Sequence, residues 1–317
     1  MRERSRVLRK IIALQKEEKL IPQESNLLIA FSGGIDSVVL THALLQLKGF
    51  LRLGRIALAH FNHMLRENTE REEEFARETA RKYGLEVYIG REKVGEVARR
   101  EGRNIEEVAR ELRYAFLRRI REEEGFDLIA TAHHLSDLVE TALIWLVRGA
   151  GLEGLIGFEA REGDVVRPLY RVTRTEIESY AGYHNLSWIE DPSNRDLSFF
   201  RNRVRLQIIP LLKETNPNLE ETFLRTREIL KAENDLLEKI SAEVMEKAAE
   251  EGCLKVEVLR NEHPAVQRRV LRNFTGIRNF SKVEQMRRLL RKGGELDLGE
   301  GLRAVRRGKF ICLKKGD

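Results

Sequence analysis

The stretch Ser32-Gly33-Gly34-Ile35-Asp36-Ser37 constrains the fold of this chain more than any other. The apolar residues 27–31 before it predict a buried parallel strand, and the apolar run 38–45 after it predicts a helix. A strand, a glycine turn and a helix N-terminus together offer backbone N–H groups and a positive dipole end to an anion. The two glycines let a phosphate approach the backbone closely. We therefore predict that residues 32–37 bind phosphate, with Asp36 placed to hold magnesium.

This turn differs from the commoner phosphate loop, Gly-x-x-x-x-Gly-Lys-Ser/Thr, because its lysine is absent. A Gly-Gly pair alone often only joins a strand to a helix. The complete six-residue pattern, however, resembles the loop of the ATP pyrophosphatase family, whose members cut ATP between the α and β phosphates. The resemblance implies ATP binding by Ser32, Gly33, Gly34, Ile35, Asp36 and Ser37. Arg110 and Arg113, three residues apart on one predicted helical face, are candidates to add positive charge at the ATP site.

Length and composition predict two domains. A chain of 317 residues with 42% hydrophobic and 34% charged residues fits a globular protein with two cores. The net charge of +6 is uneven, since residues 260–317 hold 16 Lys/Arg and 6 Asp/Glu, a balance of +10, and residues 1–259 have −4. We expect a catalytic domain over 1–213 and a basic domain over 214–317 that opens with a long helix. The basic domain indicates a nucleic-acid partner or a solvated basic surface.

Two absences indicate a cytoplasmic setting. No apolar run reaches the roughly 18 residues that span a membrane, and the charged N-terminus is unlike a signal peptide. Cys253 and Cys312 are the only cysteines, far apart and without a Cys-x-x-Cys pattern. We therefore expect no disulfide framework, zinc knuckle or iron–sulfur site.

Residues 27–200 alternate strand-like and helix-like segments, the pattern of an α/β fold with a doubly wound parallel sheet and, after it, a smaller, mostly helical basic domain. Ligands of such sheets bind at the carboxyl ends of the strands. Ser32, His60, Asn62 and His133 all follow predicted strands, so we expect one crevice to collect them. We predict helix caps at Thr69, Asn104, Ser136 and Thr173.

The run Thr131–Thr141 is the second informative stretch, because His133 ends a predicted strand and Asp137 and Glu140 lie three apart on the next helix. Carboxylates so placed hold a metal or an amine, and a histidine assists proton transfer. Taken separately, Asp137 is also an ordinary first-turn residue, and a lone histidine is usually structural. The glycines of 149–154 match a dinucleotide fingerprint, but they follow a helix, so we reject a dehydrogenase.

Over residues 27–212 the chain resembles the tRNA(Ile)-lysidine synthetases. The matching motifs are Ala59-His60-Phe61-Asn62-His63-Met64-Leu65-Arg66, the Ala-Arg-x-x-Arg-Tyr of 109–114, the run 131–141, Arg148-Gly149-Ala150-Gly151, Arg167-Pro168-Leu169, Asp191-Pro192-Ser193-Asn194 and Arg201-Asn202-Arg203-Val204-Arg205. One departure is Ser136, where the family usually has a first aspartate before Asp137. A metal role in this run therefore falls to Asp137 alone.

The resemblance implies a ligase that joins free lysine to C2 of the wobble cytidine of an isoleucine tRNA with a CAU anticodon, using ATP and Mg²⁺. It implies three catalytic residues, Asp36, His133 and Asp137, of which Asp36 and Asp137 also hold the metal. Lysine binding is expected from Asp137, Glu140 and Asn194. Binding of the tRNA is expected from Arg205, Arg268, Arg269, Arg272, Arg287, Arg288 and Arg291. A homodimer is a further expectation.

Three alternatives stay open at this point. A tRNA thiolase fits poorly, since the cysteines lie outside the motif region. A small-molecule ligase of the GMP- or NAD-synthetase type leaves the basic tail without a purpose. A non-catalytic tRNA-binding protein conflicts with the intact loop at Ser32–Ser37.

Overall fold

The computed structural model describes residues 6–65, 70–299 and 301–315. Its contacts divide the chain into two compact units, Met1–Arg225 (unit 1) and Thr226–Asp317 (unit 2). Within the described residues, no helix combines the length and apolarity that crossing a membrane requires.

Unit 1 is built on a six-stranded sheet of order β3-β2-β1-β4-β6-β5, in which all strands but β5 run parallel. Its strands are β1 (Leu27–Ala30), β2 (Ile56–Asn62), β3 (Glu86–Arg91), β4 (Leu128–Ala130), β5 (Arg161–Glu162) and β6 (Val165–Val166). Its helices are α1 (Arg6–Glu18), α2 (Ile35–Leu51), α3 (Glu70–Tyr83), α4 (Val94–Glu101), α5 (Ile105–Glu123), α6 (Leu135–Val147), α7 (Leu152–Ile156), α8 (Arg174–Tyr183), η2 (Pro192–Arg195), α9 (Phe200–Arg203), η3 (Val204–Ile208) and α10 (Ile209–Thr215).

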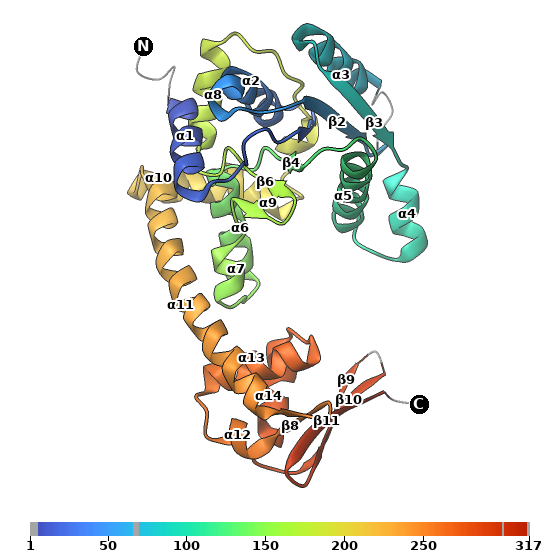
Figure 1. The fold of residues 1–317 in the computed structure, drawn as a ribbon, viewed down its shortest axis with the longest axis vertical. Helices are drawn as coiled ribbons and strands as arrows, with labels where there is room; N and C mark the ends of the chain where they lie inside the picture. Colours follow the sequence, from blue (N-terminus) through green and yellow to red (C-terminus); the bar gives the residue numbers. More distant parts are fainter. Residues whose placement is uncertain (1–5, 66–69, 300, 316–317) are drawn as a thin grey trace. The chain divides into compact units, whose positions relative to one another are not determined.

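Helices cover both faces of this sheet, as the predicted α/β fold class requires. Helices α1, α2 and α8 lie on one face and α5 lies on the other (Figure 1). Side chains of the central strand alternate between the two cores: Leu27 and Ile29 pack with residues of α1, α2 and α8, whereas Leu28 packs with residues of α5. All three are fully buried. Burying such a side chain contributes about 1.5–3 kcal/mol, which explains the unbroken apolar run of this strand.

The helical stretch from Phe200 to Thr215 carries a π-helical turn, η3. The N–H of Ile209 donates to the carbonyl of Val204, five residues back, just before Pro210, which has no N–H of its own. The sequence did not predict this continuity across the proline. Val204 and Ile209 pack on Val139 of α6, which fixes this stretch against the helix that carries Asp137.

Two of the four predicted helix caps are confirmed, and one is wrong. Asn104 caps α5 and Thr173 forms a capping box for α8, as predicted. Thr69 lies outside the described residues. The prediction for Ser136 is wrong: His134 caps α6, and the Ser136 hydroxyl donates to Glu220 of α11 (Leu219–Ala248) instead.

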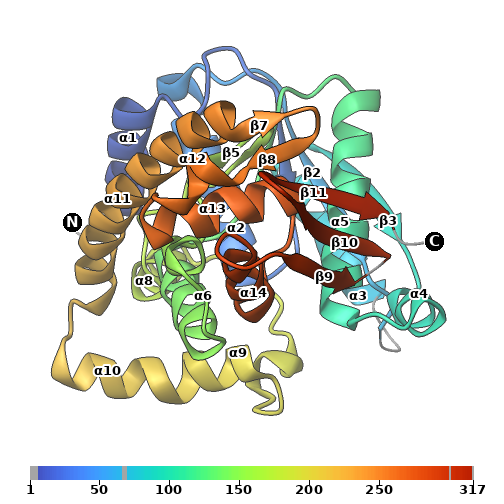
Figure 2. The ribbon, with the colours of Figure 1, turned by 90° about the horizontal axis from the view of Figure 1, so that it is seen from below.

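Unit 2 contains the rest of α11, whose length confirms the predicted long helix, and a five-stranded antiparallel sheet of order β7-β8-β11-β10-β9. Helices α13 and α14 pack on one face of the sheet (Figure 2). The remaining elements are β7 (Ala249–Glu250), β8 (Cys253–Lys255), α12 (Val256–Arg260), α13 (Pro264–Thr275), α14 (Phe280–Leu289), β9 (Gly294–Gly299), β10 (Leu302–Arg307) and β11 (Phe310–Lys315). β10 and β11 form an antiparallel hairpin near the end of the described chain.

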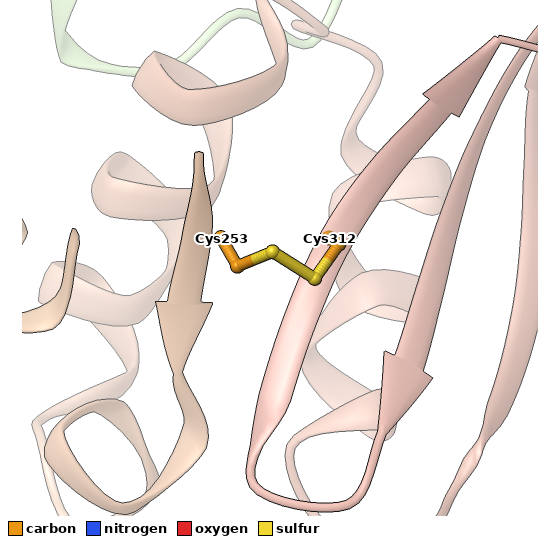
Figure 3. The surroundings of a disulfide bond; sticks show 2 residues. All are labelled: Cys253 and Cys312. Atoms are coloured by element: carbon orange, nitrogen blue, oxygen red, sulfur yellow. A yellow bond between two sulfur atoms is a disulfide. The ribbon is translucent and has the colours of Figure 1, made fainter. Parts of the chain in front are cut away.

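Cys253 and Cys312 form a disulfide, so the expectation of no disulfide is wrong (Figure 3). They are 59 residues apart in sequence, but β8 and β11 pair with these two residues directly opposite each other. Spacing along the chain carries no information about such a register, which the sheet alone decides.

Reduction of this disulfide is expected to destabilise unit 2. Cross-linking a loop of this length restricts the unfolded chain and typically contributes about 2–4 kcal/mol to the free energy of unfolding. The Cys253→Ser/Cys312→Ser variant should therefore melt at a lower temperature than the wild type. Dithiothreitol should lower the melting temperature of the wild type to that of the variant. A reductant that shifts the variant as much as the wild type would contradict the assignment.

Candidate active site

The glycine turn after β1 forms the first part of the site. Gly33 has a φ of +83°, a backbone conformation that disfavours any residue with a Cβ. Hydrogen bonds hold the turn: Gly34 N–H donates to Ser32 Oγ, Ser32 Oγ donates to Ser37 Oγ, Ser37 Oγ donates to the Gly34 carbonyl, and Ile189 N–H donates to the Gly33 carbonyl. Gly34 provides no side-chain cap for α2. The first turn of a 17-residue helix therefore has its N–H groups available for an anion.

Asp36 projects from the first turn of α2 toward a guanidinium and an imidazole ring. Nη1 of Arg174, at the start of α8, lies 3.0 Å from both carboxylate oxygens of Asp36. Nε2 of His134 lies 3.6 Å from Oδ1. Burial raises the pKa of Asp36, although His134 and Arg174 oppose the shift. The carboxylate is thus held at an energetic cost, as expected of a residue kept for function rather than stability.

His134 connects Asp36 to Asp137. It begins α6 with a capping box, in which Asp137 N–H donates to His134 Nδ1 and His134 N–H donates to Asp137 Oδ2. Its Nε2 is 3.4 Å from Asp137 Oδ2 and has no hydrogen-bond partner among the described residues. Because one ring faces both carboxylates, α2 and α6 bring Asp36 and Asp137 to the same edge of the sheet.

Asp137 and Glu140 bind two arginines from the segment that packs on α6. Arg205 donates from Nε to Glu140 at 2.6 Å and from Nη2 to Asp137 at 3.1 Å, and Arg201 contacts the same two carboxylates. Glu140 is only 1% exposed. Burial by itself raises the pKa of Asp137, but His134 and Arg201 outweigh it and hold that pKa well below its usual range. Both carboxylates are therefore suited to hold a cation.

His133 lies at the carboxyl end of β4, with Nδ1 2.9 Å from the Thr131 hydroxyl and its ring 5.4 Å from that of Phe158. Burial lowers its pKa to about 3, with further lowering from the nearby Arg167 and Arg113. His133 is therefore neutral at physiological pH and a weak base. Its chemistry suits orienting a polar group better than accepting a proton.

A cavity of about 330 Å³ lies at the N-terminal half of α5 and the end of β6. Its lining is strongly charged and includes Arg110, Tyr114 and Arg167. Arg110 and Arg113 both lie over the Tyr114 ring, at 5.0 and 5.4 Å. Both predicted arginines thus lie over the ring of Tyr114. Arg110 also lines the cavity, whose arginines suit it to bind a planar anionic group.

The donor set fits a magnesium ion shared with phosphate. Within the described ranges no group of three or more His, Cys, Asp or Glu forms a complete metal site. Magnesium, however, needs only one or two carboxylates when phosphate oxygens and water supply the rest. Asp36 and Asp137, which converge on the partnerless His134 Nε2, meet that requirement.

Several predicted site residues are placed differently from the expected roles. Arg205, expected at the tRNA, binds Glu140 and Asp137. Asn194 is exposed in η2, and no hydrogen bond between described residues joins it to either carboxylate. His60 and Asn62 are buried at the end of β2, where Asn62 donates to Glu73.

The predicted arginines of unit 2 are largely engaged within the unit. Arg268 and Arg287 both pair with Glu284, and the almost buried Arg269 pairs with Glu238. Arg272 is half-buried, and Arg288 and Arg291 are exposed.

Sequence reasoning missed His134, Arg174 and Arg201 as members of the site. His134 and Arg201 stand inside motifs that were recognised, so the motifs were a usable signal. Arg174 had no signal beyond following the capping residue Thr173, because its partner Asp36 lies 138 residues away.

The site consists of a turn with backbone N–H groups available for phosphate, at the edge of a parallel sheet, with carboxylates and arginines around it. These features define a nucleotide-binding domain of the PP-loop class. The PP-loop domain family matches residues 4–212, and the TilS-like substrate binding domain family matches residues 248–313. The chain belongs to the tRNA(Ile)-lysidine synthase family, which confirms the resemblance found in the sequence.

Individual relatives support this family assignment. A tRNA(Ile)-lysidine synthase of Persephonella marina is 37% identical over 84% of this chain and 59% of that protein. Those of Thermosipho africanus and Pseudothermotoga lettingae are 32% and 42% identical, over 96% and 62% of this chain and 73% and 44% of those proteins. The chain thus spans about half the length of the first relatives it matches. The U34-tRNA thiolase NcsA of Methanococcus maripaludis shares the fold, with a TM-score of 0.57 at 19% identity over 71% of this chain and 78% of that one.

Proposed function

We propose that this chain joins free lysine to C2 of the wobble cytidine of an isoleucine tRNA with a CAU anticodon. ATP supplies the driving force and is cut to AMP and pyrophosphate. The observation that carries the proposal is the convergence of Asp36, Asp137 and Glu140 beside the glycine turn, in a chain of the tRNA(Ile)-lysidine synthase family. Magnesium, a cytoplasmic setting and a homodimer belong to the same proposal.

In the first step, the cytosine O2 attacks the α phosphate and pyrophosphate leaves. The turn at Ser32–Ser37 and the N-terminus of α2 hold the phosphates, and Arg110 and Arg113 add positive charge. Asp36 and Asp137 would hold magnesium, which supplies charge neutralisation for the departing pyrophosphate. His133, being neutral, orients the base or the phosphate.

In the second step, the ε-amine of lysine displaces AMP from the activated C2. The amine must lose a proton before it attacks, so it needs an anionic site that accepts one. Glu140 and Asp137 attract the lysine ammonium once it replaces part of their contact with Arg201 and Arg205. Glu140 accepts the proton, because the pKa of Asp137 is held too low for that role. We infer that these arginines keep the buried carboxylates charged before lysine enters.

A thiolase remains the second candidate because of the shared fold. Sulfur transfer there needs reactive cysteines or an iron–sulfur site. Cys253 and Cys312 both lie in unit 2 and are joined to each other, so neither offers a thiol at the site. This observation favours the ligase.

The deciding experiment incubates the protein with ATP, Mg²⁺, labelled lysine and a transcript of the isoleucine tRNA. We expect lysine in the RNA, in equal amount to the pyrophosphate released, and lysidine on nucleoside analysis. A transcript with uridine at the wobble position is the matched control and should take up none. Pyrophosphate exchange driven by a small acid without RNA would overturn the proposal in favour of a small-molecule ligase.

A further inference from the structure

We propose that the outer face of the β10–β11 hairpin in unit 2 binds the phosphate backbone of RNA. This inference rests on the proposed function, because it assigns the surface that grips the tRNA. It also moves that surface away from the helical arginines that the sequence suggested.

The strand register defines the face. Arg303 lies directly opposite Lys314, and Arg307 lies directly opposite Phe310. Side chains alternate along a strand, so these four residues share one side of the hairpin. Ala304 and Ile311, which alternate with them, are buried in the core of unit 2. The packed side prevents a register slip, so the cations are held outward.

Three cations of the hairpin have no carboxylate partner in the part of the chain that the structure describes. Arg303 lies directly opposite both Lys314 on β11 and Asp297 on β9, and its Nη1 is 3.9 Å from a carboxylate oxygen of Glu295. Among the described residues, however, no ion pair is formed by Lys314, Arg307 or Lys309, all of which are exposed. A polyanion would supply partners for these three cations.

The helical side of the unit contrasts with the hairpin. Arg268 and Arg287 share Glu284, and Arg269 is engaged by Glu238 and Asn234. Those arginines would lose existing partners on binding a phosphate. Lys314, Arg307 and Lys309 of the hairpin would gain a partner, so the hairpin is a better phosphate-binding surface than these three arginines.

The layout of the face favours RNA over a flat acidic protein. Lys309 in the turn and the half-buried Phe310 place an aromatic ring among cations, an arrangement that suits stacking of an unpaired base. Acidic side chains occur only at its borders among the described residues: Glu295 and Asp297 on β9, and Glu250 paired with Lys255 on the β7–β8 side. The cations thus form a narrow strip along two strands, as a phosphate backbone requires.

The test compares two full-length variants with the same change in charge. Arg303→Glu/Lys314→Glu reverses the pair on the hairpin, and Lys239→Glu/Lys247→Glu reverses two exposed lysines of α11 within unit 2. Binding of the isoleucine tRNA is measured by fluorescence anisotropy from 50 to 300 mM salt. We expect the hairpin variant to bind about 10- to 100-fold more weakly, with a salt slope reduced by about two. The α11 variant should stay within about twofold of the wild type.

Additional variants and controls distinguish the possible results of this experiment. Arg303→Gln/Lys314→Gln should give an intermediate loss of binding and should unfold at the wild-type temperature, which separates a loss of binding from a loss of folding. Equal binding by the hairpin and α11 variants overturns the inference, even if the wild type forms lysidine. A wild type that binds RNA through the hairpin but never adds lysine overturns the proposed function alone. Polyglutamate that binds as tightly as RNA, with the same loss in the hairpin variant, overturns the RNA assignment.

Discussion

Replacing Asp36 with asparagine or alanine is expected to reduce tRNA-dependent ATP–pyrophosphate exchange by about a thousandfold. Either change removes the carboxylate next to the phosphate-binding turn and leaves the Arg174 guanidinium, 3.0 Å away in the native protein, without that partner. The measurement is exchange at saturating tRNA. Wild-type exchange in either variant would exclude Asp36 from metal binding.

Stability should not follow activity in these variants. The pKa of Asp36 is raised in the folded protein, so its charged form disfavours folding once the pH exceeds its unfolded pKa. At pH 7 the asparagine variant should therefore melt at the same temperature as the wild type or higher. Glu178→Ala is the matched control, since the exposed Glu178 is the other carboxylate bound by Arg174. It should keep near-normal exchange.

Replacing Glu140 with glutamine is expected to separate the two chemical steps. Adenylation should persist, because the turn, Asp36 and Asp137 are intact. Lysine transfer should fall by about a hundredfold, since a neutral amide neither attracts the ammonium nor accepts its proton. Single-turnover assays that follow pyrophosphate release and lysine incorporation separately will measure both. An equal loss in the two steps would contradict a role in lysine binding.

The same change should also cost some stability. Glu140 is buried and accepts hydrogen bonds from Arg201 and Arg205, whose partly exposed side chains reach solvent and keep Asp137 as a partner. We therefore expect a loss of about 1–3 kcal/mol in the free energy of unfolding. Glu176→Gln is the control, because Glu176 is a mostly buried carboxylate that binds Lys10 and caps α8 but makes no hydrogen bond or ion pair with Asp137 or Glu140 in the described structure. It should destabilise the protein without separating the two steps.

Local patterns were sufficient to predict the nucleotide-binding half of the molecule. The apolar run 27–31 predicted the central strand, and the glycine turn and the following helix were placed correctly. The polar residues after each strand marked the edge where the site lies, because parallel strands end on the same side. Two of the caps were predicted because a side chain bonds to backbone only two or three residues away.

The predictions that were wrong concern residues whose hydrogen-bond or strand partners lie far away in the sequence. The sequence favoured Ser136 over His134 as the cap of α6, because serine is the commoner capping residue. Glu220, 84 residues further on, takes the Ser136 hydroxyl instead. The extent of β8 is likewise set by its partner strand. Only Cys253–Lys255 pairs with β11, and the chain then turns into α12.

The sequence by itself determined the family, the α/β fold and the position of the phosphate-binding turn, since each follows from residues adjacent in the chain. Only the tertiary structure decided that Arg174 faces Asp36, that Arg205 holds Asp137 and Glu140, and that two cysteines 59 residues apart lie opposite each other. These partnerships form between elements brought together by packing. Their energies depend on burial and distance, neither of which is encoded in any local stretch of residues.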